Sequence, residues 1–221
     1  RLALEDSEFI LSALLEHRKH PQINQEAHNC TISANNAVLK DIDVLIEFTS
    51  PQATLENLHA CLLHRTKIII GTTGFQPEHI KQIKKASEQI PIVFSSNMSV
   101  GVNILFKLTK MTAQKTGSAY TINMSESHHV HKKDSPSGTA KTLAEIAEEA
   151  SGTKVEHIES IREDEIIGDH SVIFESGEDI ITVSHHAKTR DIFAKGALVA
   201  AKFLAKKDKG LFNMQDVLGL K

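Results

Sequence analysis

The sequence contains no tryptophan, one tyrosine and only two cysteines among its 221 residues. Two cysteines are too few for a disulfide scaffold, and Cys30 and Cys61 stand too far apart in sequence to form a CxxC pair. This scarcity is typical of proteins from a reducing compartment, so we expect a cytoplasmic location.

Long apolar runs and an excess of positive charge are also missing. The longest apolar stretches, such as Val44–Ile46 and Ile68–Ile70, are far shorter than the roughly 20 residues that span a membrane as a helix. The 25 basic and 28 acidic residues are mixed along the chain and give a formal charge of −3, so no basic surface exists to hold a polyphosphate backbone. We therefore expect neither a membrane nor a nucleic acid as a partner.

The composition is that of an ordinary globular protein, with 40% hydrophobic residues, and the length suits one large domain or two modest ones. In the first hundred residues, three β-rich runs alternate with helical stretches, which predicts a parallel sheet covered by helices. Small polar residues follow each run, at the edge where open parallel sheets bind ligands. The alternative is that these residues only form turns. The three runs are Ile42–Phe48, Lys67–Gly71 and Ile90–Phe94.

The pattern changes after a predicted helix over Val102–Gln114. Longer β segments follow, and several alternate in polarity, which predicts a mixed or antiparallel sheet with one exposed face. A helix with a face of small residues is predicted over Asp191–Lys207. We expect one domain from residues 1–99 and 190–221, interrupted by a second from residues 100–189. The β segments of the second domain are Ala119–Ser127, Val155–Arg162, Asp169–Glu175 and Asp179–His186.

The densest chemical signal lies between Glu126 and Ala140, where three of the 13 histidines and two lysines fall within six positions. A solvated polar loop is one reading, and a metal site is another, because the HHxH spacing of His128, His129 and His131 resembles that of metal ligands. The residues that follow favour a third reading. Ser137-Gly138-Thr139 leads into a predicted helix with a Ser or Thr cap, and a helix start with free N–H groups binds anions.

A cationic His/Lys segment facing such a helix start would hold a molecule with carboxylates and place a proton donor beside it. Histidine suits this role because its charge changes near neutral pH, and lysine both attracts and polarises a carboxylate. We therefore expect general acid catalysis on a small planar dicarboxylate, without a metal.

A nucleotide cofactor would be held by the first domain, and Glu16 is the candidate for its ribose. In dinucleotide-binding folds an acidic residue at the end of the second strand accepts hydrogen bonds from the ribose hydroxyls. Phe9–Glu16 could be that strand, although its leucines would also suit a helix. The ordinary alternative is that Glu16 is a surface glutamate.

Six segments, in order over nearly the whole chain, resemble the 4-hydroxy-tetrahydrodipicolinate reductase (dihydrodipicolinate reductase) family of the lysine and diaminopimelate pathway. The resemblance implies an α/β fold, with a Rossmann-type dinucleotide-binding domain interrupted by an α/β domain for substrate binding and tetramerisation. The segments are DVLIEFTSP (43–51), IGTTGF (70–75), FSSNMSVGVN (94–103), HHVHKKDSPSGTA (128–140), RDIFAKGA (190–197) and GLFNMQDVLGL (210–220).

The same resemblance assigns roles to individual residues. His128 would be the proton donor or acceptor and Lys132 the second acid. His129, Gly138 and Thr139 would bind the two carboxylates of the substrate. Glu16 falls where the family places its ribose-binding acid. The nicotinamide loop would be Gly71, Thr72 and Thr73, and the next cofactor loop Ser95, Ser96, Asn97 and Met98.

Two features depart from the family. The family opens with a Gly-rich turn that holds the cofactor pyrophosphate, but Arg1–Phe9 contains no glycine. We expect that the first βα unit, roughly 20 residues, is missing from this sequence. The alternative is a defective copy. Without the phosphate-binding turn, the sequence as given should bind its cofactor weakly. His17 stands where members that accept NADPH often carry arginine. A neutral histidine pairs weakly with a 2′-phosphate, which favours NADH over NADPH.

The reaction expected from the resemblance is reduction of 4-hydroxy-tetrahydrodipicolinate to tetrahydrodipicolinate. The 4-hydroxyl leaves as water, hydride is delivered to C4, and His128 supplies a proton at C3. Reduction of another dicarboxylate, or dehydrogenation of an aspartate-like compound, would keep the fold but change the substrate. A cofactor-sensing module without catalysis is the non-enzymatic alternative. The presence of both the HHxHK and the SGT residues argues against such a module, since a sensor has little use for a proton donor.

Overall fold

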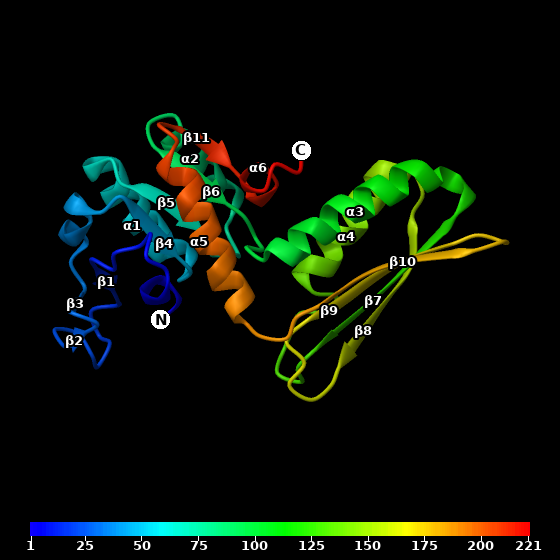
Figure 1. The fold of residues 1–221 in the computed structure, drawn as a ribbon, viewed down its shortest axis with the longest axis horizontal. Coiled ribbons are helices and arrows are strands. Elements are labelled where there is room, and N and C mark those ends of the chain that lie inside the picture. Colours follow the sequence, from blue (N-terminus) through cyan, green and yellow to red (C-terminus); the bar gives the residue numbers. More distant parts are fainter. The chain divides into compact units, whose positions relative to one another are not determined.

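The computed structural model describes residues 1–221, and its contacts divide them into two compact units, whose elements are labelled in Figure 1. Unit 1 comprises Arg1–Ser96, Ala194–Gly219 and Lys221. Unit 2 comprises Asn97–Phe193 and Leu220. Each unit has its own hydrophobic core. No helix is long and apolar enough to cross a membrane.

Unit 1 contains a four-stranded parallel sheet in the order β11-β6-β5-β4. The three β-rich runs of the first hundred residues form β4, β5 and β6, so the predicted parallel sheet is confirmed. Ile68, Ile69 and Ile70 of β5 are fully buried, as expected for a central strand covered on both faces. The elements are β4 (Val44–Glu47), α1 (Pro51–His64), β5 (Lys67–Ile70), α2 (Pro77–Ala86), β6 (Pro91–Phe94), α5 (Asp191–Ala205), β11 (Gly210–Phe212) and α6 (Met214–Val217).

The N-terminal residues of unit 1 form a separate small sheet in the order β1-β3-β2. Only Leu14–Leu15 of the candidate strand Phe9–Glu16 is β-strand, so that prediction was too long, and the helical alternative was wrong. Only two residues of this segment, Leu14 and Leu15, pair with β3. The elements are η1 (Leu2–Glu5), β1 (Leu14–Leu15), β2 (Glu26–Ala27), β3 (Cys30–Ser33) and η2 (Asn36–Asp41).

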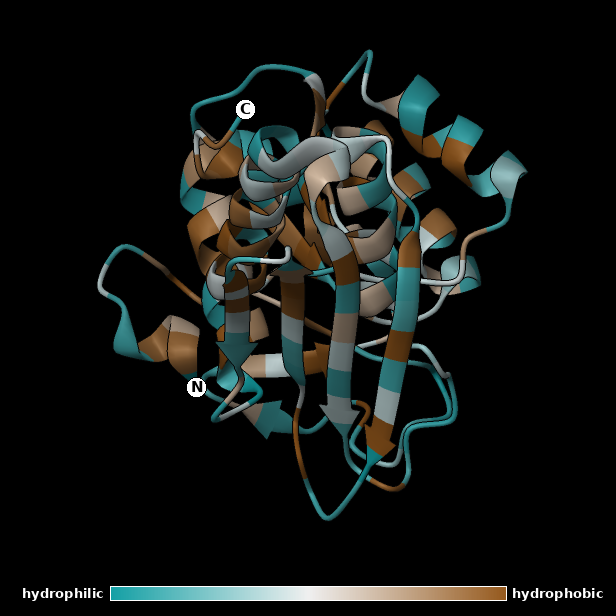
Figure 2. Cartoon of the chain, turned by 90° about the vertical axis from the view of Figure 1, so that its right-hand side faces the viewer, coloured by the Kyte–Doolittle hydropathy of each residue, from teal (hydrophilic) through white to brown (hydrophobic).

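Unit 2 is a four-stranded mixed sheet in the order β10-β9-β7-β8, as the alternating segments predicted. Helices α3 and α4 pack on one face, where apolar side chains of β7 and β9 form the core. The opposite face is turned toward the viewer in Figure 2 and mixes polar with apolar residues. The elements are α3 (Val100–Thr116), η3 (Gly117–Ala119), β7 (Thr121–His128), α4 (Gly138–Ser151), β8 (Val155–Arg162), β9 (Asp169–Glu175) and β10 (Ile180–His186).

Helix α4 begins where the sequence predicted a capped start. The Ser137 side chain accepts a hydrogen bond from the backbone N–H of Ala140 at 3.2 Å, which satisfies one of the N–H groups that the first turn leaves unpaired. At the other end, Gly152 adopts φ +73°, a left-handed conformation that glycine takes without steric cost. These two residues fix the length of α4.

The core of unit 2 depends on Leu143, a buried residue of α4. We predict that Leu143→Ala lowers the free energy of unfolding by about 2 to 5 kcal/mol, because it removes buried methyl groups and leaves a cavity. Urea unfolding followed by the fluorescence of Tyr120 measures this change. Tyr120 is the chain's one tyrosine and packs against this core, and the chain contains no tryptophan whose emission would mask that of the tyrosine. Glu145→Ala, on the exposed side of the same helix, is the control and should change stability by less than about 0.5 kcal/mol. Equal effects of the two substitutions would contradict the prediction.

Candidate active site

The candidate site lies where β7 ends and α4 begins. Alternate residues of β7 face the helices, and the first two of these, Ile122 and Met124, belong to the apolar core. The next two are Glu126 and His128, which are buried as well. The alternation of the strand therefore carries an acid and a histidine into a protein interior, where each requires a polar partner.

Each ring nitrogen of His128 has a different environment. Nδ1 forms a short hydrogen bond with Oε2 of Glu126. A carboxylate can only accept, so Nδ1 is the donor and carries a proton. Nε2 faces Gly168, where an added Cβ would lie 3.0 Å from it. Only Nε2 is therefore available for proton exchange with a ligand.

Glu126 is 1% exposed and has more than one partner. Its Oε1 accepts hydrogen bonds from Nη2 of Arg162 at 2.8 Å and from the backbone N–H of Ser137 at 3.3 Å. Burial raises the pKa of Glu126, but the hydrogen bonds from Arg162 and His128 outweigh burial and bring the pKa below its ordinary value. Glu126 is therefore a carboxylate at neutral pH.

His170 lies beside His128, with ring centroids 5.1 Å apart and the rings nearly perpendicular. Its Nε2 shares a hydrogen bond of 3.2 Å with the hydroxyl of Ser137, the residue that caps α4. Burial, followed by the neighbouring His128, lowers the pKa of His170 to about 4. His170 is therefore a neutral structural partner of the cap and not a proton donor near neutral pH.

The pKa of His128 is also lowered, chiefly by burial and further by the charges of Lys132 and Arg162, while Glu126 acts in the opposite direction. Its neutral form prevails at pH 7. A ligand with two carboxylates would raise this pKa by adding negative charge nearby, so dicarboxylate binding and protonation of His128 favour each other.

Lys132 and the start of α4 meet at the carboxylate of Asp134. Nζ of Lys132 lies 2.8 Å from Oδ1 of Asp134. The hydrogen bond from Lys132 lowers the pKa of Asp134, and the backbone N–H of Gly138 contributes in the same direction. A carboxylate of the chain itself thus already lies against Lys132, the predicted second acid, and Gly138, predicted to bind the substrate. This position therefore suits a carboxylate.

The remaining predicted substrate residues lie around the same loop. Gly138 is exposed and has open space where a Cβ would stand. Oγ1 of Thr139 accepts a hydrogen bond of 3.2 Å from Nδ2 of Asn97, so the structure brings together one residue predicted for the substrate and one predicted for the cofactor. Nδ1 of His129 is buried without a hydrogen-bond partner.

The histidines of the HHxH motif do not converge as metal ligands would. The side chain of His128 is buried, whereas that of His131 is 76% exposed and lies near Glu165. Glu126, His128 and His170 do come close together, but the guanidinium of Arg162 is bonded to the same carboxylate and disfavours a second cation there.

In unit 1, Gly71 and Thr72 follow β5 on its carboxyl side. A Cβ at Gly71 would lie 2.2 Å from Cε1 of Phe48, so only glycine allows this ring to lie over the loop. Phe48 is 47% exposed and presents an aromatic face that could stack on a flat ring. The sequence analysis gave Phe48 no role. Thr72 is buried and bonded to Thr54 Oγ1 at 3.0 Å, whereas Thr73 is exposed.

The second predicted cofactor loop divides between the units. Ser95 donates its backbone N–H to the carbonyl of Ile70 at 3.2 Å, and Ser96 is exposed. Met98, already in unit 2, is 1% exposed, so the structure does not open this residue to a cofactor.

Glu16 and His17 follow β1 directly and are exposed. Oε1 of Glu16 accepts a hydrogen bond from the backbone N–H of His17 at 2.7 Å. The position of Glu16 at the end of a strand is the one expected of a ribose-binding acid. Its side chain leaves Oε2 free of any protein hydrogen bond.

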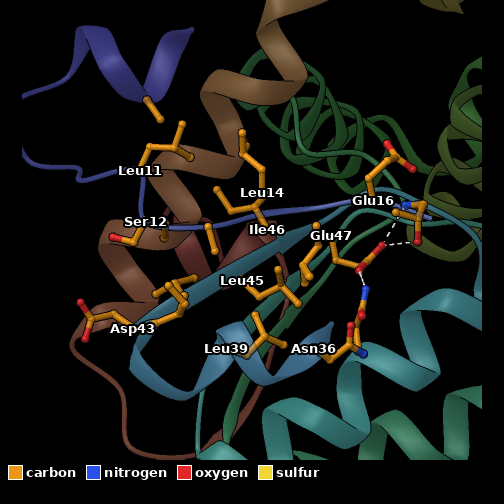
Figure 3. Close-up of a pocket in the computed structure, with 18 of the residues that line it drawn as sticks. Leu11, Ser12, Leu14, Glu16, Asn36, Leu39, Asp43, Leu45, Ile46 and Glu47 are labelled. Atoms are coloured by element: carbon orange, nitrogen blue, oxygen red, sulfur yellow. Dashed lines mark hydrogen bonds between the residues drawn. The ribbon is translucent and has the colours of Figure 1, made fainter. Parts of the chain in front are cut away.

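A cavity of about 1530 Å³ lies in unit 1 between β1 and β4 (Figure 3). Leu14 of β1 lines it on one side, and Leu45 of β4 on the other. Both strands are edge strands, because β1 pairs only with β3 and β4 only with β5. Two unpaired strand edges therefore border one cavity with an apolar lining.

Glu47, at the end of β4, is a buried acid that the sequence analysis overlooked. Its Oε1 accepts a hydrogen bond from the backbone N–H of Thr49 at 3.0 Å, and its Oε2 accepts a short one from Asn57 (Figure 3). These contacts tie the loop after β4 to α1. Within the β4 run, an acid in an otherwise apolar segment was the available signal.

Comparison with known proteins matches the chain along nearly its whole length. The model of the dihydrodipicolinate reductase N-terminus matches residues 1–98, and that of the C-terminus matches residues 101–218. A 4-hydroxy-tetrahydrodipicolinate reductase of Syntrophotalea carbinolica is 40% identical, with 99% of this chain and 93% of that protein covered. The corresponding protein of Geotalea daltonii is 41% identical, with 96% and 90% covered.

Solved structures show the same fold. A dipicolinate-bound dihydrodipicolinate reductase from Paenisporosarcina sp. TG-14 superposes with a TM-score of 0.81 at 20% identity, covering 97% of this chain and 91% of that one. An aspartate dehydrogenase from Thermotoga maritima has a TM-score of 0.52 at 11% identity, covering 93% and 92%. The Rossmann-type fold class predicted from the sequence is confirmed.

The buried His170 gives a pH prediction for stability. Its folded pKa of about 4 lies below the ordinary 6.5, so the unfolded chain binds more protons between these values, and unit 2 should lose up to about 3 kcal/mol as pH falls from 6.5 to 4. We predict that His170→Gln reduces this loss. Urea unfolding at several pH values, followed by Tyr120 fluorescence, measures it, with His59→Gln, an exposed histidine of α1, as the control. An unchanged pH slope in His170→Gln would contradict the assignment.

Proposed function

The chain belongs to the dihydrodipicolinate reductase family, and we propose that it carries out that family's NAD(P)H-dependent reduction of 4-hydroxy-tetrahydrodipicolinate to tetrahydrodipicolinate in lysine and diaminopimelate biosynthesis. The observation that carries the proposal is local to unit 2. A buried Glu126–His128 pair lies beside a lysine and a helix start whose position already accepts a carboxylate.

His128 supplies the proton at C3 of the substrate from Nε2, since Nδ1 is held by Glu126. Lys132 is the second acid and neutralises the nearer carboxylate, which would replace that of Asp134. His129, Gly138 and Thr139 bind the carboxylates through side-chain and backbone donors at the start of α4.

The cofactor is a nicotinamide dinucleotide, and when bound it would supply hydride to C4, after or alongside loss of the 4-hydroxyl as water. Several residues of unit 1 fit such a molecule: Glu16 has an unused carboxylate oxygen at a strand end, and Phe48 lies over Gly71 beside the exposed Thr73. We infer a preference for NADH, because His17 is a poor partner for a 2′-phosphate when neutral. Ser95, Ser96, Asn97 and Met98 form the second cofactor loop.

The two units serve as the dinucleotide-binding domain, with proposed bounds 1–99 and 190–221, and the substrate domain, 100–189. The open sheet face of unit 2 is the proposed surface of a homotetramer. Support comes from Ile161 and Ile180, two apolar residues that are exposed on that face. The two free, buried cysteines agree with the proposed cytoplasmic location.

A further parallel strand would fill the cavity between β1 and β4. It would satisfy the unpaired edges of both strands, bury Leu14 and Leu45, and join the two sheets of unit 1 into one. The turn after this strand is where a Gly-rich loop would hold the pyrophosphate.

The proton roles can be tested by substitution. We predict that His128→Gln or Lys132→Ala lowers kcat by roughly 10² to 10⁴, the range for loss of a general acid, measured as NADH oxidation with the enzymatically generated substrate. Lys133→Ala, the exposed neighbour, should leave kcat within about twofold of the original. Unchanged turnover of His128→Gln would show that the proton comes from elsewhere.

The cavity between β1 and β4 has its own test. We predict that an N-terminal extension carrying an apolar strand and a Gly-rich turn lowers the Kd for NADH by roughly tenfold or more, because it supplies the phosphate site. Calorimetric titration measures the Kd. The control extension has the same turn, but glycine and serine replace the apolar strand residues. If both extensions bind NADH like the 221-residue chain, the cavity does not accept this strand.

A further inference from the structure

We propose that Glu126 is the positioning residue of the proton donor His128 and that Arg162 holds Glu126 in place for this purpose. The proposal rests on the function argued above, in which His128 exchanges a proton with the substrate. It adds two residues to which the sequence motif gave no role.

The two oxygens of Glu126 have separate tasks. Oε1 accepts from Arg162 at 2.8 Å and from the backbone N–H of Ser137, whereas Oε2 bonds to Nδ1 of His128. Arginine–carboxylate pairs are frequently bidentate, with both oxygens bonded to the guanidinium. Here one oxygen is kept for the imidazole, which fixes the ring orientation and places its resident proton on Nδ1.

The consequence is that Nε2 becomes the nitrogen that exchanges protons. Gly168 lies in front of it, and a Cβ there would come within 3.0 Å of Nε2 and 3.4 Å of Cδ2. The space before Nε2 thus depends on glycine at position 168. Directed proton transfer requires that Glu126 holds the ring at Nδ1 and that a ligand can reach Nε2.

Arg162 also links the acid to the carboxylate-binding loop. Besides Glu126, its Nη2 donates to the backbone carbonyl of Asp134 at 2.7 Å. Glu126 in turn accepts from the N–H of Ser137, three residues further on. The Glu126–Arg162 pair therefore holds both ends of the Asp134–Ser137 segment and sets it relative to His128.

The charged and titratable groups around His128 come from four places. Glu126 lies on the same strand, Arg162 on β8, His170 on β9 and Lys132 in the loop after β7. Glu126 is the one negative group among them. Removing its charge leaves only groups that disfavour protonated His128, so the pKa of His128 should fall.

The direct test is Glu126→Gln in the full chain. We expect kcat at pH 7 to fall by about 10²-fold and the pH at which activity declines on the alkaline side to move down. Nitrogen-15 NMR of the histidine rings, with His128 assigned from the spectrum of His128→Gln, should show a lower pKa and loss of the Nδ1–H tautomer. Glu149→Gln, on the exposed side of α4, is the matched control and should change neither.

Two further measurements keep the proposal testable if Glu126→Gln folds poorly. In the unsubstituted chain, neutral His128 should carry its proton on Nδ1, and a proton on Nε2 would overturn the proposal. Gly168→Ala leaves the Glu126–Arg162 pair intact but should lower kcat at least tenfold while the tautomer of His128 is retained.

The outcomes separate this proposal from the one it rests on. Normal turnover of His128→Gln would remove the proposed function. Loss of activity in His128→Gln, together with normal activity and an unchanged His128 tautomer in Glu126→Gln, would overturn only the positioning role. A merely structural role would lower the melting temperature of Glu126→Gln without moving the pKa of His128, and that result would also count against the proposal.

Discussion

The candidate site depends on one buried negative charge, the carboxylate of Glu126. A carboxylate inside a protein is costly unless charged and polar partners surround it. Arg162, His128 and the N–H of Ser137 provide these partners from β8, β7 and the loop before α4. Because all of them bond to the same group, the charge sets the relative positions of the proton donor and the carboxylate-binding loop.

The rest of unit 2 makes this arrangement possible. The alternation of β7 places Glu126 and His128 above a core of isoleucine and methionine, and β8 runs parallel to β7 so that Arg162 pairs with His128 in register. On β9, His170 stays neutral and bonds to Ser137, which caps α4. Packing, strand register and helix capping thus converge on the same few atoms.

Local patterns were enough to predict much of this from the sequence. The apolar runs of β4, β5 and β6, the alternation of β9 and the Ser137 cap each depend on neighbouring residues. The partnership of Glu126 with Arg162 does not, because it arises from pairing between strands 36 residues apart. The extent of β1 was also beyond local pattern, since it depends on which strands flank it. The proton and cofactor roles of individual residues stay predictions.

The central claim is that unit 2 holds a dicarboxylate with Nε2 of His128 toward it and Nδ1 toward Glu126. A crystal structure of the chain with pyridine-2,6-dicarboxylate tests this most directly. The account predicts one carboxylate at Lys132 and the start of α4, displacing Asp134, with Nε2 of His128 facing the ring and the Glu126 bond retained. A ligand bound away from this loop, or a His128 ring turned so that Nδ1 faces the ligand, would contradict it.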